Sequence, residues 1–525
     1  MDIKEVDILG DQINHYWYYS SKAKMNRIIF LTKENFLILF IFLVVILFRC
    51  PLLLQNDTFY TIKVGEHIIN HGLTTKDAFT FHEGINYTSP HWFYDIVIYL
   101  IFSIGGFFSV YLSTIIFSLI LVSCLYFGFL KLYGHRFVSF FVVCVIIFMI
   151  DQGLTARAQL ITYILFVLEA LILEFSRRKK INNLFLTSSL MAISIAIVNV
   201  HCATWVVFFI LFMPYFAEHV LSYFCSSTDD DKDSVKIKKL TACKNENIKV
   251  LFFVFMVCIL TGFISPTGML PYTYLYDTYQ SQTVNFISEH LPLVPFAFPR
   301  FLFFISSILT LLIFTRLKIS VSQLLMFLGL TLMALMSVRQ TMLLFLISGF
   351  LLCDLLTRFF MANNPQRIEF YNSNIFTLKG TIVTLLFMAL VSYNGISNNL
   401  KNPSFDHVYP VEAVEYLTKH VNNKDQLRVF AMYDDGSYLL FKGFKVFIDS
   451  RADLYTLPFN KTKDYFNEYS EFVNLSKNIS SFIDEYQLTH LIIRNKSLPI
   501  NTQLTLNAHL KEVYKDDVFT VYQVI

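Results

Sequence analysis

Two aspartates follow the first long apolar stretch of the chain, in positions that suit proton transfer. Asp57 comes three residues after the apolar run 36–54, so a membrane helix over that run would hold its carboxylate at the lipid–water boundary. Partial removal of water brings the pKa of a carboxylate toward neutral pH, where it can act as a general base. Asp77 lies in the same polar segment. We predict that both acids are catalytic; the alternatives are a helix cap for Asp57 and a turn for Asp77.

Four other polar side chains stand beside later apolar runs. They are, in chain order, Arg157 in TARAQL, His201 in VNVHCATW, Glu289 in ISEHLP and Arg339 in SVRQTM. Fixed cations on the same side of the membrane as the acids suit a lipid phosphate. We therefore predict that these four residues bind the substrate. Taken one at a time, they have simpler explanations, such as an arginine that reaches out of the lipid or a histidine satisfied inside the protein.

The composition identifies the elements that position these residues. The chain has 525 residues, of which 55% are hydrophobic and only 15% charged. Soluble domains carry about 25% charged residues, and single soluble cores stop growing near roughly 250–300 residues. The chain is therefore predicted to be a multi-pass membrane protein, and disordered, collagen-like and disulfide-scaffold classes are excluded. The net charge of +3 gives no indication of nucleic-acid binding.

Apolar runs near the length that a bilayer requires, about 20 residues, predict eleven membrane spans. They are 36–54, 107–130, 137–151, 159–175, 183–199, 203–222, 250–264, 301–315, 321–338, 341–357 and 380–396. The apolar stretch 92–104 contains Asp95 and ends at a Gly-Gly pair, so we interpret it as an interfacial helix, with a twelfth span as the alternative.

The charges of the loops orient these spans. With residues 1–35 in the cytoplasm, the inside segments hold 22 Lys and Arg, and the outside segments before residue 397 hold six. This asymmetry follows the positive-inside rule. The first outer loop is then 55–106, the transmembrane domain is 36–396, and the tail 397–525 lies outside the cytoplasm. We expect a multi-pass protein of the cell membrane.

The tail has the pattern of a small soluble α/β domain. A helix is predicted after Pro410, another near 473–486, and strands at 427–433, 444–448, 489–493 and 517–523. The motif FIDSRADLY places Asp449, Arg451 and Asp453 together. We favour a salt-bridged turn, with acceptor recognition as the alternative. Within the membrane domain, Glu169 is the one mid-span carboxylate; an interhelical hydrogen bond is favoured over a proton relay.

The order of the motifs resembles the GT-C-type bacterial membrane glycosyltransferases, specifically poorly characterised members with a soluble C-terminal domain. It is carried by QNDTFY, GEHIINHG, KDAFTF, SPHWFYD, TARAQLITYIL, IVNVHCATW, SPTG, ISEHLP, SVRQTM and DDGSYLLFKGFKVFIDSRADLY. The resemblance implies an all-α polytopic membrane fold with about eleven helices, followed by the α/β domain. It also implies transfer of a sugar from a polyprenyl-phosphate-linked donor at the extracytoplasmic face.

The resemblance assigns roles to particular residues. It implies that Asp57 deprotonates or orients the acceptor hydroxyl and that Arg157, His201 and Arg339 hold the lipid phosphate. Two departures stand out: Thr58 replaces the second acid found in some relatives, and Ser265 replaces the usual Asn of the Asn-Pro-x-Gly-like motif. Either departure points to a different acceptor or to a relative that has lost catalysis.

The expected partners are a lipid-linked sugar donor, a glycan, lipid or protein acceptor, and the bilayer, with no nucleic acid. No cofactor is expected besides the donor itself, and no metal, since no Cys/His pairing has zinc-site spacing. The competing functions are a lipid-linked glycan transporter, flippase or polymerase, and a non-catalytic membrane assembly protein. Polar residues at span ends rather than mid-membrane, together with the lack of paired repeats, favour the enzyme over a transporter.

Overall fold

The computed structural model describes residues 32–86, 89–226, 240–281, 283, 287–315, 317–393, 405–421 and 423–525. Of the predicted cytoplasmic segment 1–35, only the last four residues fall within these ranges. Nearly all of that expectation therefore lies outside the described residues.

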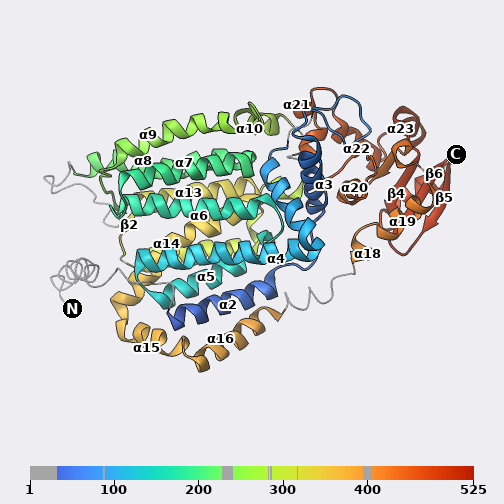
Figure 1. The fold of residues 1–525 in the computed structure, drawn as a ribbon. Coiled ribbons are helices and arrows are strands. Elements are labelled where there is room, and N and C mark those ends of the chain that lie inside the picture. Colours follow the sequence, from blue (N-terminus) through green and yellow to red (C-terminus); the bar gives the residue numbers. More distant parts are fainter. Residues whose placement is uncertain are drawn as a thin grey trace.

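An apolar helix occupies each of the eleven ranges predicted to cross the membrane. These helices are α2 (Lys33–Arg49), α4 (Trp92–Tyr133), α5 (Arg136–Ile150), α6 (Ala158–Arg177), α7 (Asn183–Val200), α8 (Trp205–Ser226), α9 (Ile248–Leu260), α12 (Pro299–Phe314), α13 (Val321–Met336), α14 (Thr341–Asn363) and α16 (Leu378–Val391). They run side by side in one bundle around a continuous apolar core (Figure 1).

Six helices in the described part of the chain are long and apolar enough to cross a membrane, or seven if the bent pair α15 (Pro365–Ile375) and α16 is one span. The apolar helices α9, α12 and α13 are shorter, and the count of eleven spans stays a prediction. The stretch 92–104 is helical and forms the first part of α4. That helix breaks at Gly105 and Gly106, where Gly106 has φ +63°, a backbone conformation that glycine adopts without strain.

Shorter elements lie between the bundle helices and in the tail. The helices are α3 (Asn56–His71) and α10 (Leu270–Gln280), and strands β1 (Leu240–Thr241) and β2 (Ile319–Ser320) pair in parallel. The 3₁₀ turns are η2 (Asp151–Gly153), η3 (Cys202–Thr204), η4 (Thr261–Ile264), η5 (Ser288–His290), η6 (Pro295–Ala297), η7 (Val338–Gln340), η8 (Lys424–Gln426) and η9 (Ala452–Tyr455).

The tail contains a four-stranded sheet with the order β3-β4-β6-β5. Its strands are β3 (Val429–Ala431), β4 (His490–Arg494), β5 (Leu510–Lys515) and β6 (Phe519–Val524); β3 and β4 are parallel and the other pairs antiparallel. The helices are α18 (Phe405–Val408), α19 (Val411–His420), α20 (Tyr433–Phe441), α21 (Leu457–Asn460), α22 (Tyr465–Val473), α23 (Ile479–Tyr486) and α24 (Leu498–Thr505).

Two details of the predicted tail are wrong. The range 444–448 forms no strand; only Val446 makes isolated bridges, to Val429 and Thr80. The strand β5 was missed because its sequence, LKEVYK, is polar. None of its residues is buried, since it lies at the edge of the sheet, where alternation of apolar side chains is not required.

The segment that follows α2 and the tail share one hydrophobic core, although about 350 residues separate them. In Figure 1, α3 stands between the helix bundle and the tail. The ring of Phe59 lies 4.7 Å from that of Tyr409 and 5.3 Å from that of Tyr438, and Tyr60 and Val64 belong to the same apolar cluster as many tail residues. The polar segment 55–91 is therefore folded against the tail.

Candidate active site

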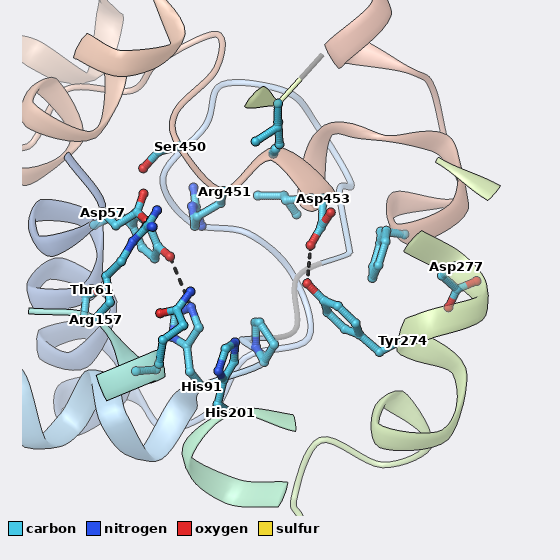
Figure 2. A pocket seen from close by; sticks show the side chains of 18 of the residues that line it. Asp57, Thr61, His91, Arg157, His201, Tyr274, Asp277, Ser450, Arg451 and Asp453 are labelled. Carbon is cyan, nitrogen blue, oxygen red and sulfur yellow. Dashed lines mark hydrogen bonds and ion pairs between the residues drawn. The ribbon is translucent and has the colours of Figure 1, made fainter. Parts of the chain in front are cut away.

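A cavity of about 220 Å³ lies where α3, α10, the turns beside the bundle helices and the tail segment 450–461 meet (Figure 2). Five of the six residues predicted from the sequence line it: Asp57, Arg157, His201, Glu289 and Arg339. They come from the start of α3, the N-cap of α6, the C-cap of α7, and the turns η5 and η7. These helix ends and turns bring all five side chains to one cavity.

Asp57 and Glu289 bind the same arginine. Arg157 donates from Nε to Asp57 Oδ2 at 2.6 Å, contacts that oxygen again through Nη2, and donates from Nη1 to Glu289 Oε1 at 2.9 Å. Burial alone disfavours the charged guanidinium, but the two carboxylates outweigh it and raise the pKa of Arg157. Among the described residues, no hydrogen bond reaches Oδ1 of Asp57. Because Asp57 lines the cavity, this oxygen is available to accept a hydrogen bond from a bound ligand.

The alternative role of Asp57 as a helix cap is not realised. The N-cap residue of α3 is Gln55, and the Asp57 carboxylate is bound by a side chain 100 residues away. Its position in the first turn of α3 still places a negative charge at the positive end of the helix dipole.

Asp77 is not among the residues that line the cavity, and its role as a catalytic acid stays a prediction. Its side chain is fully buried: Oδ1 accepts from Arg451 Nη1 at 2.6 Å, and Oδ2 accepts from the backbone N–H groups of Phe79 (3.0 Å) and Thr80 (2.7 Å). Both oxygens are occupied by the fold. Asp77 therefore anchors Arg451 and a tight turn, which agrees with the alternative of a turn acid.

Arg339 places a positive charge in the cavity, and this charge acts on the Asp453 carboxyl in the same cavity. Its Nη1 lies 3.4 Å from His290 Nε2, and no carboxylate pairs with it in the described part of the chain. Burial and the nearby Arg339 lower the pKa of His290 to about 4 and that of His201 well below its usual value. Both imidazoles are neutral at physiological pH, so this side of the cavity presents a positive charge between two neutral rings.

Sequence reasoning missed His91, which also lines the cavity. Its Nδ1 bonds Asp95 Oδ1 at 2.7 Å, and Asp95 Oδ2 accepts from Ser89 Oγ at 2.6 Å. Its Nε2 lies 3.1 Å from the Tyr60 hydroxyl. The signal was present in SPHWFYD, where a histidine and an aspartate stand four residues apart at a helix start and thus share one face.

The tail forms the opposite wall of the cavity. The Tyr274 hydroxyl of α10 donates to Asp453 Oδ2, and burial raises the pKa of Asp453 (Figure 2). Lys461 pairs with Asp277 at 3.3 Å. Arg451 binds Asp449 through Nε and Nη2 at 2.8 and 2.7 Å, so the predicted salt-bridged turn is confirmed.

Glu169 lies apart from this site, in the middle of α6. Its side chain is buried, and neither carboxyl oxygen has a hydrogen-bond partner within the described ranges. The expected interhelical hydrogen bond is therefore not formed. Among the same residues there is no group of three His, Cys, Asp or Glu side chains able to hold a metal ion, and metal independence stays a prediction.

Comparison with known proteins relates this architecture to solved structures. No protein-family model matches the chain, and no curated protein sequence matches it. The chain is similar to the Archaeoglobus fulgidus oligosaccharyltransferase AglB in complex with an inhibitory peptide and a dolichol-phosphate. The TM-score is 0.57 at 11% identity, over 88% of this chain and 69% of that one.

Two further structures share the fold. ArnT from Cupriavidus metallidurans, bound to undecaprenyl phosphate, gives a TM-score of 0.55 at 9% identity over 93% of this chain and 97% of that chain. The mycobacterial arabinofuranosyltransferase AftD gives 0.52 at 10% identity over 93% of this chain and 41% of that one. The chain therefore has the GT-C-type fold of these membrane glycosyltransferases, as the order of its motifs predicted.

Proposed function

We propose that the protein is a membrane glycosyltransferase that moves a sugar from a polyprenyl-phosphate-linked donor to an acceptor hydroxyl. The observation that carries the proposal is the convergence of Asp57, Arg157 and Arg339 in one cavity at the helix ends. A polyprenyl phosphate is too apolar to leave the bilayer, so its reaction needs a polar pocket at the edge of the membrane helices. The fold shared with transferases crystallised with dolichol-phosphate or undecaprenyl phosphate supports the same donor class.

In this proposal Asp57 is the general base. Arg157 holds one carboxylate oxygen and leaves the other directed at the cavity, so the acceptor hydroxyl can be bound and deprotonated there. Cleavage of the sugar–phosphate bond adds negative charge to the leaving phosphate. Arg339, with the neutral His201 beside it, provides a fixed positive charge for that oxygen. Glu289 keeps Arg157 in place.

A second cavity of about 130 Å³ supports a lipid-linked donor. It shares four residues with the first cavity: Arg157, Gln159, Glu289 and Arg339. Its other lining residues are largely apolar side chains at the ends of α5, α6, α12 and α14, including Phe301 and Phe345. The first isoprene units would lie in this second cavity while the phosphate reaches the shared arginines. The acceptor, whether a glycan, a lipid or a protein, would enter from the tail side.

We further propose eleven spans, with the N-terminus in the cytoplasm and the tail outside. The charge distribution of the loops supports this orientation. Cys243 is exposed in a loop predicted to be cytoplasmic, and the tail has no cysteine. On intact cells, a membrane-impermeant maleimide should label Leu506→Cys, at a position 75% exposed in the tail, and should leave Cys243 unlabelled until the cells are opened. Labelling of Cys243 alone would reverse the topology.

The activity is tested with purified protein in nanodiscs, a panel of undecaprenyl-phosphate-linked sugars, and release of undecaprenyl phosphate as the readout. Asp57→Asn should lower turnover by about a thousandfold, since a general base contributes roughly 10²–10⁴, and should retain binding of undecaprenyl phosphate. The matched control is Asp484→Asn on the exposed surface of α23, which should behave as wild type. Unchanged turnover in Asp57→Asn contradicts the base, and lack of undecaprenyl phosphate binding contradicts the donor class.

A further inference from the structure

Three histidines line the cavity, and within the described part of the chain only His91 bonds a carboxylate. His201 and His290 lie near Arg339, and each is kept neutral by burial and by that positive charge. His91 instead bonds the carboxylate of Asp95, which is fully buried and cannot exchange its partner for water. One ring in the site is therefore built to carry a proton.

The contacts of His91 favour the protonated form of the ring. Burial disfavours its charge, but Asp95 and the nearby Asp57 outweigh that effect, so the pKa of His91 is raised. With both nitrogens protonated, Nδ1–H donates to Asp95 and Nε2–H donates to Tyr60 at the cavity wall. The neutral His201 lies 6.3 Å from His91 between ring centroids, and Tyr94 and Arg157 line the same cavity.

Asp95 is held independently of the histidine. Its second oxygen accepts from Ser89 Oγ, and the preceding loop is tied to the bundle by the Cys202 N–H, which donates to the Pro90 carbonyl at 2.8 Å. The backbone of α3 also passes against this point, since a Cβ at Gly65 would meet the Asp95 carbonyl oxygen at 2.1 Å. The dyad is thus preorganised before any substrate enters.

We propose that His91 is the general acid of the site, which protonates the phosphate as it leaves the sugar, and that Asp95 is its positioning residue. The inference rests on the proposed glycosyl transfer and extends it. The acceptor oxygen forms a bond to the sugar carbon and passes its proton to Asp57, while the bond from that carbon to the phosphate oxygen breaks. That oxygen keeps the electron pair and takes the Nε2 proton of His91, which exchanges its hydrogen bond to the Tyr60 hydroxyl for one to the phosphate. After release, solvent returns a proton to His91 and removes one from Asp57.

The first test uses undecaprenyl phosphate alone, so that it needs neither the sugar nor the acceptor. Binding to wild type, His91→Gln and the surface control Asp484→Asn is measured in nanodiscs between pH 6 and 8.5. The second ionisation of a phosphate monoester, with a pKa near roughly 6, affects all three proteins alike. His91 is charged below its pKa and neutral above it, so wild type should gain about tenfold in affinity over His91→Gln at the acid end, and little at pH 8.5.

The second test keeps His91 but shifts the pH at which it titrates. Asp95→Asn should move the midpoint of this pH dependence down by about one to three pH units, because an opposite charge is lost beside the ring. The pH midpoint of the His91 NMR signal, compared between wild type and Asp95→Asn, should shift by the same amount. His91→Gln leaves the buried Asp95 in place and keeps the claim testable if Asp95→Asn folds poorly.

The outcomes separate the two proposals. Parallel pH curves for wild type and His91→Gln would overturn the role of His91 and leave the glycosyltransferase proposal standing. Absence of binding by wild type at every pH would instead overturn the lipid-phosphate donor on which both proposals depend. An affinity gain in wild type that disappears in His91→Gln and shifts in Asp95→Asn supports the general acid.

Discussion

The two walls of the cavity use arginine in opposite ways. On the bundle side, Arg339 has no carboxylate partner among the described residues. On the tail side, Arg451 is buried and bound by both Asp77 and Asp449. The first can meet the charge of an incoming ligand, whereas the second is already neutralised by the fold. An arginine without a carboxylate partner can bind a ligand, whereas an arginine paired with buried carboxylates stabilises the fold.

The largest effect is expected from Arg451→Met. It leaves two fully buried carboxylates without a counter-charge, and breaking a buried pair in this way costs about 3–5 kcal/mol. We expect the tail to unfold, measured as loss of protease resistance and a lower Tm in detergent. Arg451→Lys, which keeps a charge, should recover part of the loss. A stable Arg451→Met protein would show that the tail wall does not depend on this network.

The same contrast, between a residue available to a ligand and one bound by the fold, exists between Asp57 and Asp77 in the segment 55–91. Asp77→Asn removes a carboxylate that accepts from Arg451 and two backbone N–H groups, and should lower the free energy of unfolding by about 1–3 kcal/mol. Turnover per folded molecule should be nearly unchanged, in contrast to the loss expected for Asp57→Asn. Thermal unfolding and turnover, measured on the same preparations, distinguish the two. If Asp77→Asn loses turnover without a change in Tm, Asp77 takes part in the reaction.

Arg339→Gln should behave in the opposite way to Arg451→Met. Because no carboxylate among the described residues forms an ion pair with Arg339, the Tm should stay within experimental error. The affinity for undecaprenyl phosphate should fall by about tenfold or more, the effect of losing one charge-assisted hydrogen bond. Arg367→Gln, at an exposed position on α15, is the matched control. Equal affinity in the two variants would place the phosphate elsewhere.

The smallest effect is expected at the contact between the walls. Tyr274→Phe removes the hydroxyl that donates to Asp453, and one hydrogen bond contributes about 0.5–1.5 kcal/mol. The Tm should drop slightly, and labelling of a cysteine placed at Pro458 should become faster as the α10–tail contact loosens. Lys461→Ala, which breaks the exposed pair with Asp277, should change less than Tyr274→Phe does.

The bundle wall was predictable because the ends of apolar runs set the depth of the adjacent residues. Asp57, Arg157 and Arg339 could thus be assigned to one level without knowing which helices are neighbours. Their pairing could not be read from the sequence, since Arg157 and Glu289 meet across 132 residues. The positive-inside pattern and the helix ranges were equally accessible, because both depend on local composition.

The tail wall was less predictable for the same physical reason. The role of Asp77 is decided by Arg451, which lies 374 residues away along the chain. The dyad of His91 and Asp95 was a local signal at helical spacing. It was missed because Asp95 was used only to decide whether the stretch 92–104 crosses the membrane. The polar edge strand β5 lacks the alternation by which strands are recognised.

The core shared by α3 and the tail also constrains how the protein is made. The Tyr409 hydroxyl donates to the Leu54 carbonyl at 2.6 Å across 355 residues of chain. At a synthesis rate of roughly 5–20 residues per second, α3 would wait on the order of 20–70 s for its aromatic neighbours to be translated. During that interval the rings of Phe59 and Tyr60 have no partner from the tail. A truncated chain would leave Asp57 and these aromatic rings exposed on an incomplete, aggregation-prone intermediate. Quality control that removes such an intermediate would therefore also remove chains whose active site is not assembled.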